Sequence, residues 1–353
     1  MHQPKRFIQV GLGGFGGYWV RDVMPRLIDD LGIARAVAVV DMNADTFPQV
    51  QHKYHLPPER CYTDMERAFA ENPADFVIIV VPPKYHESVV DLALGYHMDV
   101  LSEKPIADTM EACARVFHKV QDAGRKMAVT MSHRFDQDKQ TLEAAIKSDT
   151  YGPLHYIVHR FTCNLRHFGD WGHFRHTIPD TLLIEGTVHH FDILRALSGS
   201  NAETVYAQSW NPAWGEYAGD STALVSIKME NGVRCFYEGA KANATTLNGW
   251  GQDYLRAECR DATLELDRRQ LVARHGDGSG RMTTVDLPLL QQPAWMNPWL
   301  AERFVNWLCG GEAPPNQLAD NIQCAALLFA AVESAHSGQP VQVQEFLQRY
   351  LAR

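Results

Sequence analysis

The chain has 353 residues, a length that favours two domains, or one domain with a large appendage. Apolar residues make up 45% and charged residues 21%, as in an ordinary soluble globular protein, and the formal net charge is -9. This net negative charge argues against a nucleic-acid backbone or an anionic membrane as the main partner. It does not exclude a local basic pocket.

The seven cysteines lie far apart, and no two of them form a C-x-x-C pair. This pattern favours neither a disulfide framework nor a thiolate zinc site, and we expect a reduced, cytoplasmic setting. A strand pattern begins almost at once, so we expect no signal peptide. The apolar run 76–81 is too short to span a bilayer and is typical of a strand buried on both faces.

The first 132 residues alternate short apolar strands with helical segments. We expect strands within 6–13, 34–41, 75–83, 99–105 and 125–133, and helices after the first strand and at 63–69, 84–95 and 109–121. This alternation predicts a doubly wound parallel sheet, which is a Rossmann dinucleotide-binding fold, over residues 1–132. Thr63 and Glu66 have the spacing of a capping box for the helix at 63–69. Pro25 falls inside the first helix, which we expect to kink or stop near Met24.

The pattern changes after residue 133. A helical stretch near 136–148 is followed by six strand-like segments, at 154–162, 203–210, 221–229, 232–241, 253–267 and 270–276. Asn231-Gly232 is typical of a hairpin turn between two of them. An Ala/Leu-rich helix is expected at 318–337. We predict a second domain over 133–353, an α+β domain with an open, mainly antiparallel sheet and helices on one side.

A glycine motif lies directly between the first strand and the first helix. Gly11, Gly13 and Gly16 form G-x-G-x-x-G, in which the first glycine allows a tight turn, the second lets the backbone approach a pyrophosphate, and the third lets helix and strand pack closely. The loop residues expected to hold the cofactor are Gly11, Gly13, Gly14, Phe15 and Gly16. The motif alone is also compatible with an ordinary turn.

Asp41 ends the second strand, where a ribose-binding acid is expected. A carboxylate at this position accepts hydrogen bonds from ribose hydroxyls and repels a 2′-phosphate, so we expect NAD rather than NADP. The alternative interpretation is a solvated acid at the end of a strand.

The order of the motifs "GLGGFG", "VVDMNAD", "VVPPKYHESVVDLAL" and "LSEKPIAD" resembles the Gfo/Idh/MocA oxidoreductase family, named for glucose–fructose oxidoreductase, inositol dehydrogenase and a rhizopine-catabolism protein. "HRFD" (133–136), "EGTVHHFDILR" (185–195) and "SGQPVQV" continue the resemblance. It is specific up to about residue 199 and weaker from 200 to 315. It implies a nicotinamide-binding domain, a sheet domain that often forms homodimers or homotetramers, and redox chemistry on a carbohydrate or cyclitol.

By this resemblance, Lys104 is the lysine near the substrate hydroxyl and the nicotinamide, and Glu103 lies near the cofactor ribose. Pro82 and His86 match the turn that borders the cofactor. Lys104 follows a strand whose carboxyl end is expected over the cofactor crevice, where a lysine can hydrogen-bond the reacting oxygen and stabilise developing alkoxide charge. Taken without its flanking motif, Lys104 is more typical of a surface lysine whose stem packs along a strand end.

The stretch "LLIEGTVHHFDILR" (182–195) contains two adjacent histidines. On a helix at about 100° per residue, Glu185, His189 and Asp192 share one face, whereas His190 points elsewhere. The resemblance puts His189 in the position of the catalytic base and Glu185 in that of its partner acid, where the family more often has aspartate. Imidazole suits removal of a hydroxyl proton near neutral pH. A structural core histidine is the alternative for His189, and we expect His190 to pack against the sheet or a subunit interface.

The segment from His155 to His176 contains five histidines and three arginines but one acid. In the resembling family this region contacts substrate, which suggests a polar, sugar-like substrate with an anionic group as one option. The expected substrate-binding residues are His133, Arg134, His159, Trp171 and Arg175. A solvated or interface loop is the alternative. We expect no metal, because no helical H-x-x-x-H occurs and acids are few.

These patterns predict an NAD(P)-dependent dehydrogenase or reductase acting on a sugar, glycoside or inositol. Two alternatives stay open: a glycosidase that uses bound NAD for transient ring oxidation, and a non-catalytic regulator that senses NAD or sugar. The presence of Lys104, Glu185 and His189 argues against the regulator. We expect a small-molecule substrate, no nucleic-acid or membrane partner, and self-association through the second sheet.

Overall fold

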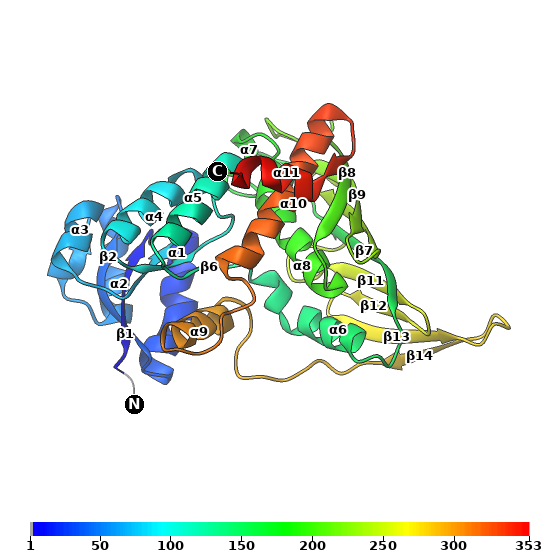
Figure 1. The fold of residues 1–353 in the computed structure, drawn as a ribbon, viewed down its shortest axis with the longest axis horizontal. Helices are drawn as coiled ribbons and strands as arrows, with labels where there is room; N and C mark the ends of the chain where they lie inside the picture. The colour runs from blue at the N-terminus through cyan, green and yellow to red at the C-terminus, as the bar shows by residue number, and fades with distance from the viewer. Residues whose placement is uncertain (1–2, 353) are drawn as a thin grey trace. The chain divides into compact units, whose positions relative to one another are not determined.

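The computed structural model describes residues 3–352, which form two compact units (Figure 1). Unit 1 comprises the residues up to Ser132 together with Ala294–Ile322, and unit 2 comprises His133–Pro293 and the residues from Gln323 onward. The boundary at 132/133 is the one expected from the change of pattern. The sequence-based assignment of everything after 133 to the second domain was wrong for Ala294–Ile322, which returns to unit 1.

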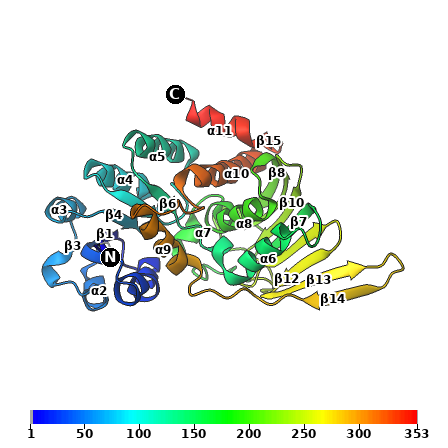
Figure 2. The same ribbon diagram turned by 60° about the horizontal axis from the view of Figure 1, so that its bottom comes forward.

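Helix α9 (Met296–Leu308) accounts for this return. Ala301, Phe304 and Val305 are fully buried in the core of unit 1, and the ring of Phe304 lies edge-on to that of Phe76, with centroids 5.5 Å apart. Figure 2 shows α9 beside the blue helical segment that follows the glycine loop. The helix is recognisably amphipathic in the sequence, but a periodic pattern does not say which of two sheets will receive the apolar face.

The sheet of unit 1 is entirely parallel, as predicted. Its strands follow the order β3-β2-β1-β4-β5-β6. Their bounds are β1 Lys5–Val10, β2 Ala34–Val40, β3 Cys61–Tyr62, β4 Phe76–Ile79, β5 Asp99–Ser102 and β6 Met127–Val129. The connecting helices are α1 Phe15–Tyr18, α2 Phe47–Tyr54, α3 Met65–Glu71, α4 His86–Gly95 and α5 Met110–Asp122. The four strand residues of β4 are all fully buried, as the apolar run predicted.

Two helix ends differ from the sequence expectations. The first helix does not stop at Met24, because Met24 and Pro25 keep helical dihedral angles between two π-helical stretches, Trp19–Val23 and Arg26–Asp30. In a π turn, a backbone carbonyl oxygen accepts from the N–H five residues further along instead of four. Because Pro25 has no N–H, the carbonyl oxygen that it would have bound can accept from the N–H of the residue after it. Helix α3 is capped one residue later than predicted: the carboxylate of Asp64, rather than Thr63, accepts from the backbone N–H of Arg67 at 3.1 Å.

Unit 2 is built on a nine-stranded sheet of order β14-β13-β12-β11-β7-β10-β9-β8-β15. The bounds are β7 Leu154–Thr162, β8 Ala202–Trp210, β9 Thr222–Met229, β10 Arg234–Ala240, β11 Tyr254–Cys259, β12 Thr263–Asp267, β13 Gln270–Gly276, β14 Met282–Asp286 and β15 Val341–Gln342. Only the pair β7 and β10 is parallel, which confirms a mainly antiparallel sheet. The stretch 253–267, expected as one strand, turns back on itself to form β11 and β12.

Helices α6 (Gln137–Lys147) and α8 (Val188–Ser198) pack against each other and against this sheet (Figures 1 and 2). The remaining helices are α7 His173–Thr177, α10 Leu318–Ser337 and α11 Val343–Leu351. In β7 the side chains of Ile157, His159 and Phe161 are fully buried, whereas those between them are partly exposed. This alternation is that of a sheet with one covered face. Within residues 3–352, no helix combines the length and apolar character that a membrane span requires.

Candidate active site

The glycine loop of unit 1 depends on the absence of side chains at two positions. Gly11 has φ +91°, and a Cβ there would lie 2.0 Å from the carbonyl oxygen of Val80; a Cβ on Gly16 would lie 2.4 Å from the carbonyl oxygen of Gly11. These contacts are far shorter than packing allows. Around Gly13 and Gly14, in contrast, a Cβ would meet no atom nearer than 4.0 Å. This open, side-chain-free surface is the kind of cradle that a pyrophosphate fills, so the loop fits a dinucleotide.

Asp41 is attached to this loop, rather than solvated as in the alternative interpretation. Its Oδ2 accepts from the backbone N–H of Leu12 at 2.7 Å and from that of Gly13 at 3.1 Å, while Oδ1 accepts from Asn43 N–H at 2.8 Å. The carboxylate therefore lies against the glycine turn at the carboxyl end of β2.

Gln9, on β1 beneath this loop, is a supporting residue that sequence reasoning missed. Its buried side-chain amide donates to the carbonyl oxygens of Gly11 (2.9 Å) and Gly16 (3.2 Å), and so closes the turn from below. The available signal was a polar side chain within an otherwise apolar strand.

Glu103 lies in the interior of unit 1. Its carboxylate accepts from the indole N–H of Trp19 at 2.8 Å and from the backbone N–H of Lys104 at 3.2 Å, and its side chain is buried. Burial raises the pKa of Glu103. Lys104 follows it with a half-buried side chain, immediately before a cis peptide bond to Pro105. The pair therefore occupies the carboxyl end of β5, as expected.

His86 joins two loops at that end of the sheet. The ring is fully buried, and its nitrogens lie 2.9 Å from the carbonyl oxygen of Pro105 and 2.8 Å from that of Val81. The neighbouring Pro82 is exposed. Phe15 is 51% exposed on the first turn of α1, and its ring stacks on that of Tyr18 at 5.0 Å. His86 thus joins the loops that follow β4 and β5 from inside.

In unit 2, the segment with two histidines is not a uniform α-helix. Leu182–Thr187 forms a π-helical stretch, and α8 starts at Val188. Because a π turn contains more residues than an α turn, the 100° spacing assumed from Glu185 to His189 does not hold across the segment. A sequence pattern does not mark such a local widening.

His189 projects into a group of aromatic rings. Its imidazole, 6% exposed, lies parallel to that of His133, with centroids 3.9 Å apart and an angle of 8° between planes. The indole of Trp250 stands edge-on to both rings, 5.1 Å from His133 and 6.1 Å from His189. The stacked pair combines a residue at the start of unit 2 with one from α8, and both were predicted to be site residues.

Three of the expected polar residues, Glu185, Arg175 and Arg134, form ion pairs inside unit 2. Glu185 is buried, and its carboxylate binds the guanidinium of Arg175 at 3.0 Å. Arg134 is also buried and binds the carboxylate of Asp192 at 3.1 Å. The fully buried Asp192 thus connects α8 to the segment after unit 1, and Arg134, which we expected to contact substrate, takes part in this ion pair.

Lys241, which sequence reasoning missed, is enclosed by aromatic rings. Its ammonium lies 4.1 Å from the ring of Phe161, 4.0 Å from that of Trp171 and 4.2 Å from that of Trp250, and the residue is fully buried. Cation–π contacts of this kind stabilise a desolvated ammonium. Trp171 also lies beneath the guanidinium of Arg175 at 5.4 Å, so the predicted loop residues meet here.

His159 and His190 lie behind this group, both fully buried, with their rings edge to face and the ring centroids 4.7 Å apart. His190 packs against the sheet, as predicted. His159 was expected to contact substrate, but its side chain points from β7 into the covered interior, where it meets Asp253. A strand residue on the covered face is not distinguishable from one on the open face until the register is known.

Comparison with known proteins supports the family that the sequence motifs resemble. Residues 5–131 match the family model described as "Oxidoreductase family, NAD-binding Rossmann fold", and residues 140–259 match "GFO/IDH/MocA C-terminal domain". An uncharacterized protein, y4oX, of Sinorhizobium fredii is 41% identical over 98% of this chain and 97% of its own length. A D-apiose dehydrogenase of Rhizobium rhizogenes is 21% identical over 90% and 93%.

Among solved structures, an oxidoreductase from Agrobacterium radiobacter, in complex with NAD+, L-tartaric acid and magnesium, superposes with a TM-score of 0.82. The identity is 19%, and the match covers 97% of this chain and 99% of the other, so it bears on the fold. The two family models and the glycine loop lead to one conclusion. The chain belongs to the Gfo/Idh/MocA oxidoreductase family, and its first unit is an NAD-binding Rossmann domain.

Proposed function

We propose that the protein is an NAD-dependent dehydrogenase or reductase that acts on a hydroxyl-bearing carbon of a sugar, glycoside or cyclitol. The observation that carries this proposal is the fixed imidazole of His189, which is nearly buried and stacked on His133 among aromatic rings. A base held in one orientation suits proton transfer, because general acid–base catalysis depends on geometry before pKa. Membership of an oxidoreductase family and the D-apiose dehydrogenase relative support the substrate class.

In the proposed reaction, His189 takes the proton of the substrate hydroxyl when that carbon is oxidised and returns it in reduction. Lys104, which matches the family's lysine near the substrate hydroxyl, stabilises the negative charge that develops on a substrate oxygen. Glu185 acts through its ion pair with Arg175, which fixes the helical turn that precedes His189. When bound, the nicotinamide supplies the hydride acceptor or donor.

NAD is the proposed cofactor in preference to NADP. The carboxylate of Asp41, held by two loop amides, keeps a negative charge at the end of β2. A 2′-phosphate brought to that place would meet this charge, whereas ribose hydroxyls can donate to it. Gly13 and Gly14 offer the open surface for the pyrophosphate.

The proposed substrate surface is made by the aromatic and cationic side chains of unit 2. His133, Trp171 and Arg175 are each partly exposed and lie on segments that meet near α8. Indole can stack on the apolar face of a sugar ring, and guanidinium can bind hydroxyls or a carboxylate. A sugar acid or an acidic cyclitol therefore fits this surface well.

We further propose that the protein self-associates through the outer face of its nine-stranded sheet. Phe236 on β10 is 53% exposed, and Leu224 on the adjacent β9 is 47% exposed. Both side chains point away from the face that α6 and α8 cover. Exposed apolar residues on a large open sheet favour a subunit interface.

The proposal is tested by a panel of aldoses, aldonic and uronic acids, cyclitols and glycosides, each with NAD and with NADP. We expect NADH to form in proportion to oxidised product with at least one polyol or sugar acid. Release of reducing sugar from a glycoside without net NADH would instead identify redox-assisted glycoside cleavage. NAD binding without turnover of any panel member or glycoside would contradict the proposed activity.

A further inference from the structure

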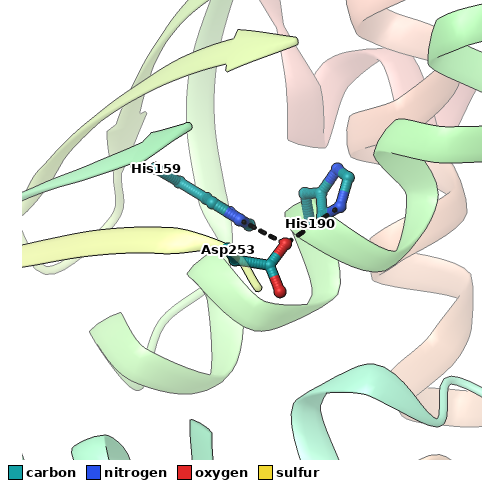
Figure 3. A group of neighbouring side chains, drawn as sticks. All are labelled: His159, His190 and Asp253. Carbon is teal, nitrogen blue, oxygen red and sulfur yellow. Dashed lines mark hydrogen bonds and ion pairs between the residues drawn. The ribbon is translucent and has the colours of Figure 1, made fainter. Parts of the chain in front are cut away.

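Behind α8, buried polar side chains from several elements lie around the carboxylate of Asp253 (Figure 3). Asp253, just before β11, is fully buried, and its Oδ2 lies 2.7 Å from the ammonium of Lys139 on α6. Its Oδ1 lies 3.4 Å from Nε2 of His159 on β7 and 3.6 Å from Nε2 of His190 on α8. One carboxylate therefore connects two helices and two strands of unit 2.

The charges in this group follow from burial and from the Lys139–Asp253 pair. Burial alone would raise the pKa of Asp253, but the ammonium of Lys139 holds this pKa well below its usual range. Burial lowers the pKa of His190 far below its usual range and lowers that of His159 as well. The group therefore contains an ion pair and two neutral imidazoles.

A directional chain of hydrogen bonds defines the tautomer of His190. The hydroxyl of Thr187 donates to the phenol oxygen of Tyr237 at 3.1 Å, and the phenol lies 2.8 Å from Nδ1 of His190. Burial raises the pKa of Tyr237, so its phenol keeps its proton and donates to Nδ1. The proton of the neutral ring then sits on Nε2, which faces Asp253.

The same three side chains also have the spacing of metal ligands, since their donor atoms all lie within 4.8 Å of one another. The other oxygen of the same carboxylate, Oδ2, however, binds the ammonium of Lys139, which also binds Asp138 at 3.1 Å. A divalent cation there would face this buried positive charge. The geometry therefore favours a polar network over a metal centre.

We propose that Asp253 is a positioning residue for His189. The phenol of Tyr237 lies 2.8 Å from Nδ1 of His190, and the carboxylate of Asp253 lies against the other edge of the ring at 3.6 Å, beyond hydrogen-bonding distance. Packed between them, the ring fixes the rotation of α8 about its axis, and this rotation sets the direction of the neighbouring imidazole at 189. Adjacent residues of an α-helix differ by about 100°, so a helix pinned at His190 toward the sheet presents His189 toward His133 and Trp250. A displacement of a reacting group by about 1 Å can cost roughly a hundredfold in rate, so such pinning matters for turnover.

This inference rests on the proposed role of His189, and the experiment separates the two. The variants are Asp253→Asn and Tyr237→Phe, each alone and in the His189→Ala background, with Tyr156→Phe on β7 as a matched control. Tyr156 lies on the same sheet and does not contact His190. The assay uses the panel substrate with the highest NADH yield, with NAD affinity and melting temperature measured in parallel. Histidine-selective ¹⁵N NMR reports ring tautomer and orientation without any substrate.

We expect Asp253→Asn to lower kcat by roughly ten- to a hundredfold and Tyr237→Phe by about tenfold, with NAD affinity unchanged. In the His189→Ala background neither substitution should lower the residual rate further. The Nε2–H signal of His190 should be lost or shifted in both variants, and the ring signals of His189 should move with it. Tyr237→Phe leaves the buried charges in place, so its rate and ring signals test the inference even if Asp253→Asn does not fold.

Several results would overturn the inference. Equal rate losses in the presence and absence of His189, unchanged ring signals of His189 in folded Tyr237→Phe, or the same rate loss in Tyr156→Phe would each indicate a purely structural role. One tightly held zinc or other metal ion per chain, lost in Asp253→Asn, would replace the positioning network with a metal site. A wild-type rate in His189→Ala would instead refute the proposed function.

Discussion

The imidazole rings of His133 and His189 lie face to face, 3.9 Å apart and 8° from parallel. Neither ring can turn about its Cβ–Cγ bond without colliding with the other, so the orientation of His189 depends on a flat side chain at 133. Trp250 closes the edges of both rings. The pair therefore presents the proposed base in one orientation.

This stacking predicts different outcomes for two substitutions of His133. His133→Phe keeps a flat ring and should retain kcat within about threefold, with a higher KM if the imidazole also binds substrate. His133→Ala should lower kcat by roughly tenfold, because the imidazole at 189 gains rotational freedom. Steady-state kinetics on both variants measure the difference, and equal losses of kcat would argue against ring support.

Asp41 should control cofactor choice. Asp41→Ala removes the negative charge that faces a 2′-phosphate and the acceptor for the amides of Leu12 and Gly13. We expect NAD to bind about tenfold more weakly and the preference for NAD over NADP to fall by at least as much. Calorimetry with both cofactors gives the ratio. Asp45→Ala, an exposed acid just beyond, serves as the control, and an unchanged ratio in Asp41→Ala would remove Asp41 from this role.

The ion pairs of Glu87 should make the free energy of unfolding depend on pH. The guanidinium of Arg115, at 2.7 Å, together with Lys119 lowers the pKa of Glu87 to about 2. Because the folded-state pKa lies below the unfolded value of about 4.3, this stabilisation is complete above that value and is lost as the pH falls toward 2. The site is partly solvated, so we expect about 0.2 to 1 kcal/mol.

Urea unfolding at several pH values between 7 and 3 measures this effect. Glu87→Gln should be less stable than the wild type at neutral pH and should show a shallower fall with acid. Glu66→Gln, at an exposed site on α3, should behave as the wild type. Parallel pH curves for the wild type and Glu87→Gln would show that the ion pair contributes nothing.

Phe236 should be required for self-association if the open sheet face is an interface. Phe236→Asp places a charge on that face without touching the covered side, so we expect a smaller assembly with an unchanged fold. Light scattering measures the mass, and circular dichroism checks the fold. Asn306→Ala, an exposed substitution on α9 of unit 1, is the control. A wild-type mass in Phe236→Asp would place any interface elsewhere.

The sequence predicted the elements whose signals are local. Regular alternation of apolar strands and helices predicted the parallel sheet of unit 1, and the helix at 318–337 lies where it was expected. The glycine motif and Asp41 were also identified, because each has a residue type that its position requires. His190 was correctly separated from His189, since neighbours on a helix face different ways.

The features that were missed depend on contacts between distant segments. Lys139, Asp253 and Tyr237 look like ordinary helix and strand residues until the register of β7, β10 and β11 brings them together. Ala294–Ile322 was assigned to the wrong unit for the same reason. His159 and Arg134 were expected at the substrate surface because of the segments on which they lie, but burial and ion pairing place their side chains in the interior. The π turn before His189 has no sequence signal of its own.

The central claim is that His189 and Lys104 each act in the chemical step. Single-turnover formation of NADH by His189→Ala and Lys104→Ala, with NAD affinity measured on the same preparations, tests it most directly. The account predicts that each substitution slows the chemical step by about a hundredfold or more while NAD affinity changes less than about threefold. Wild-type rates in either variant, with a folded protein and bound NAD, would contradict it.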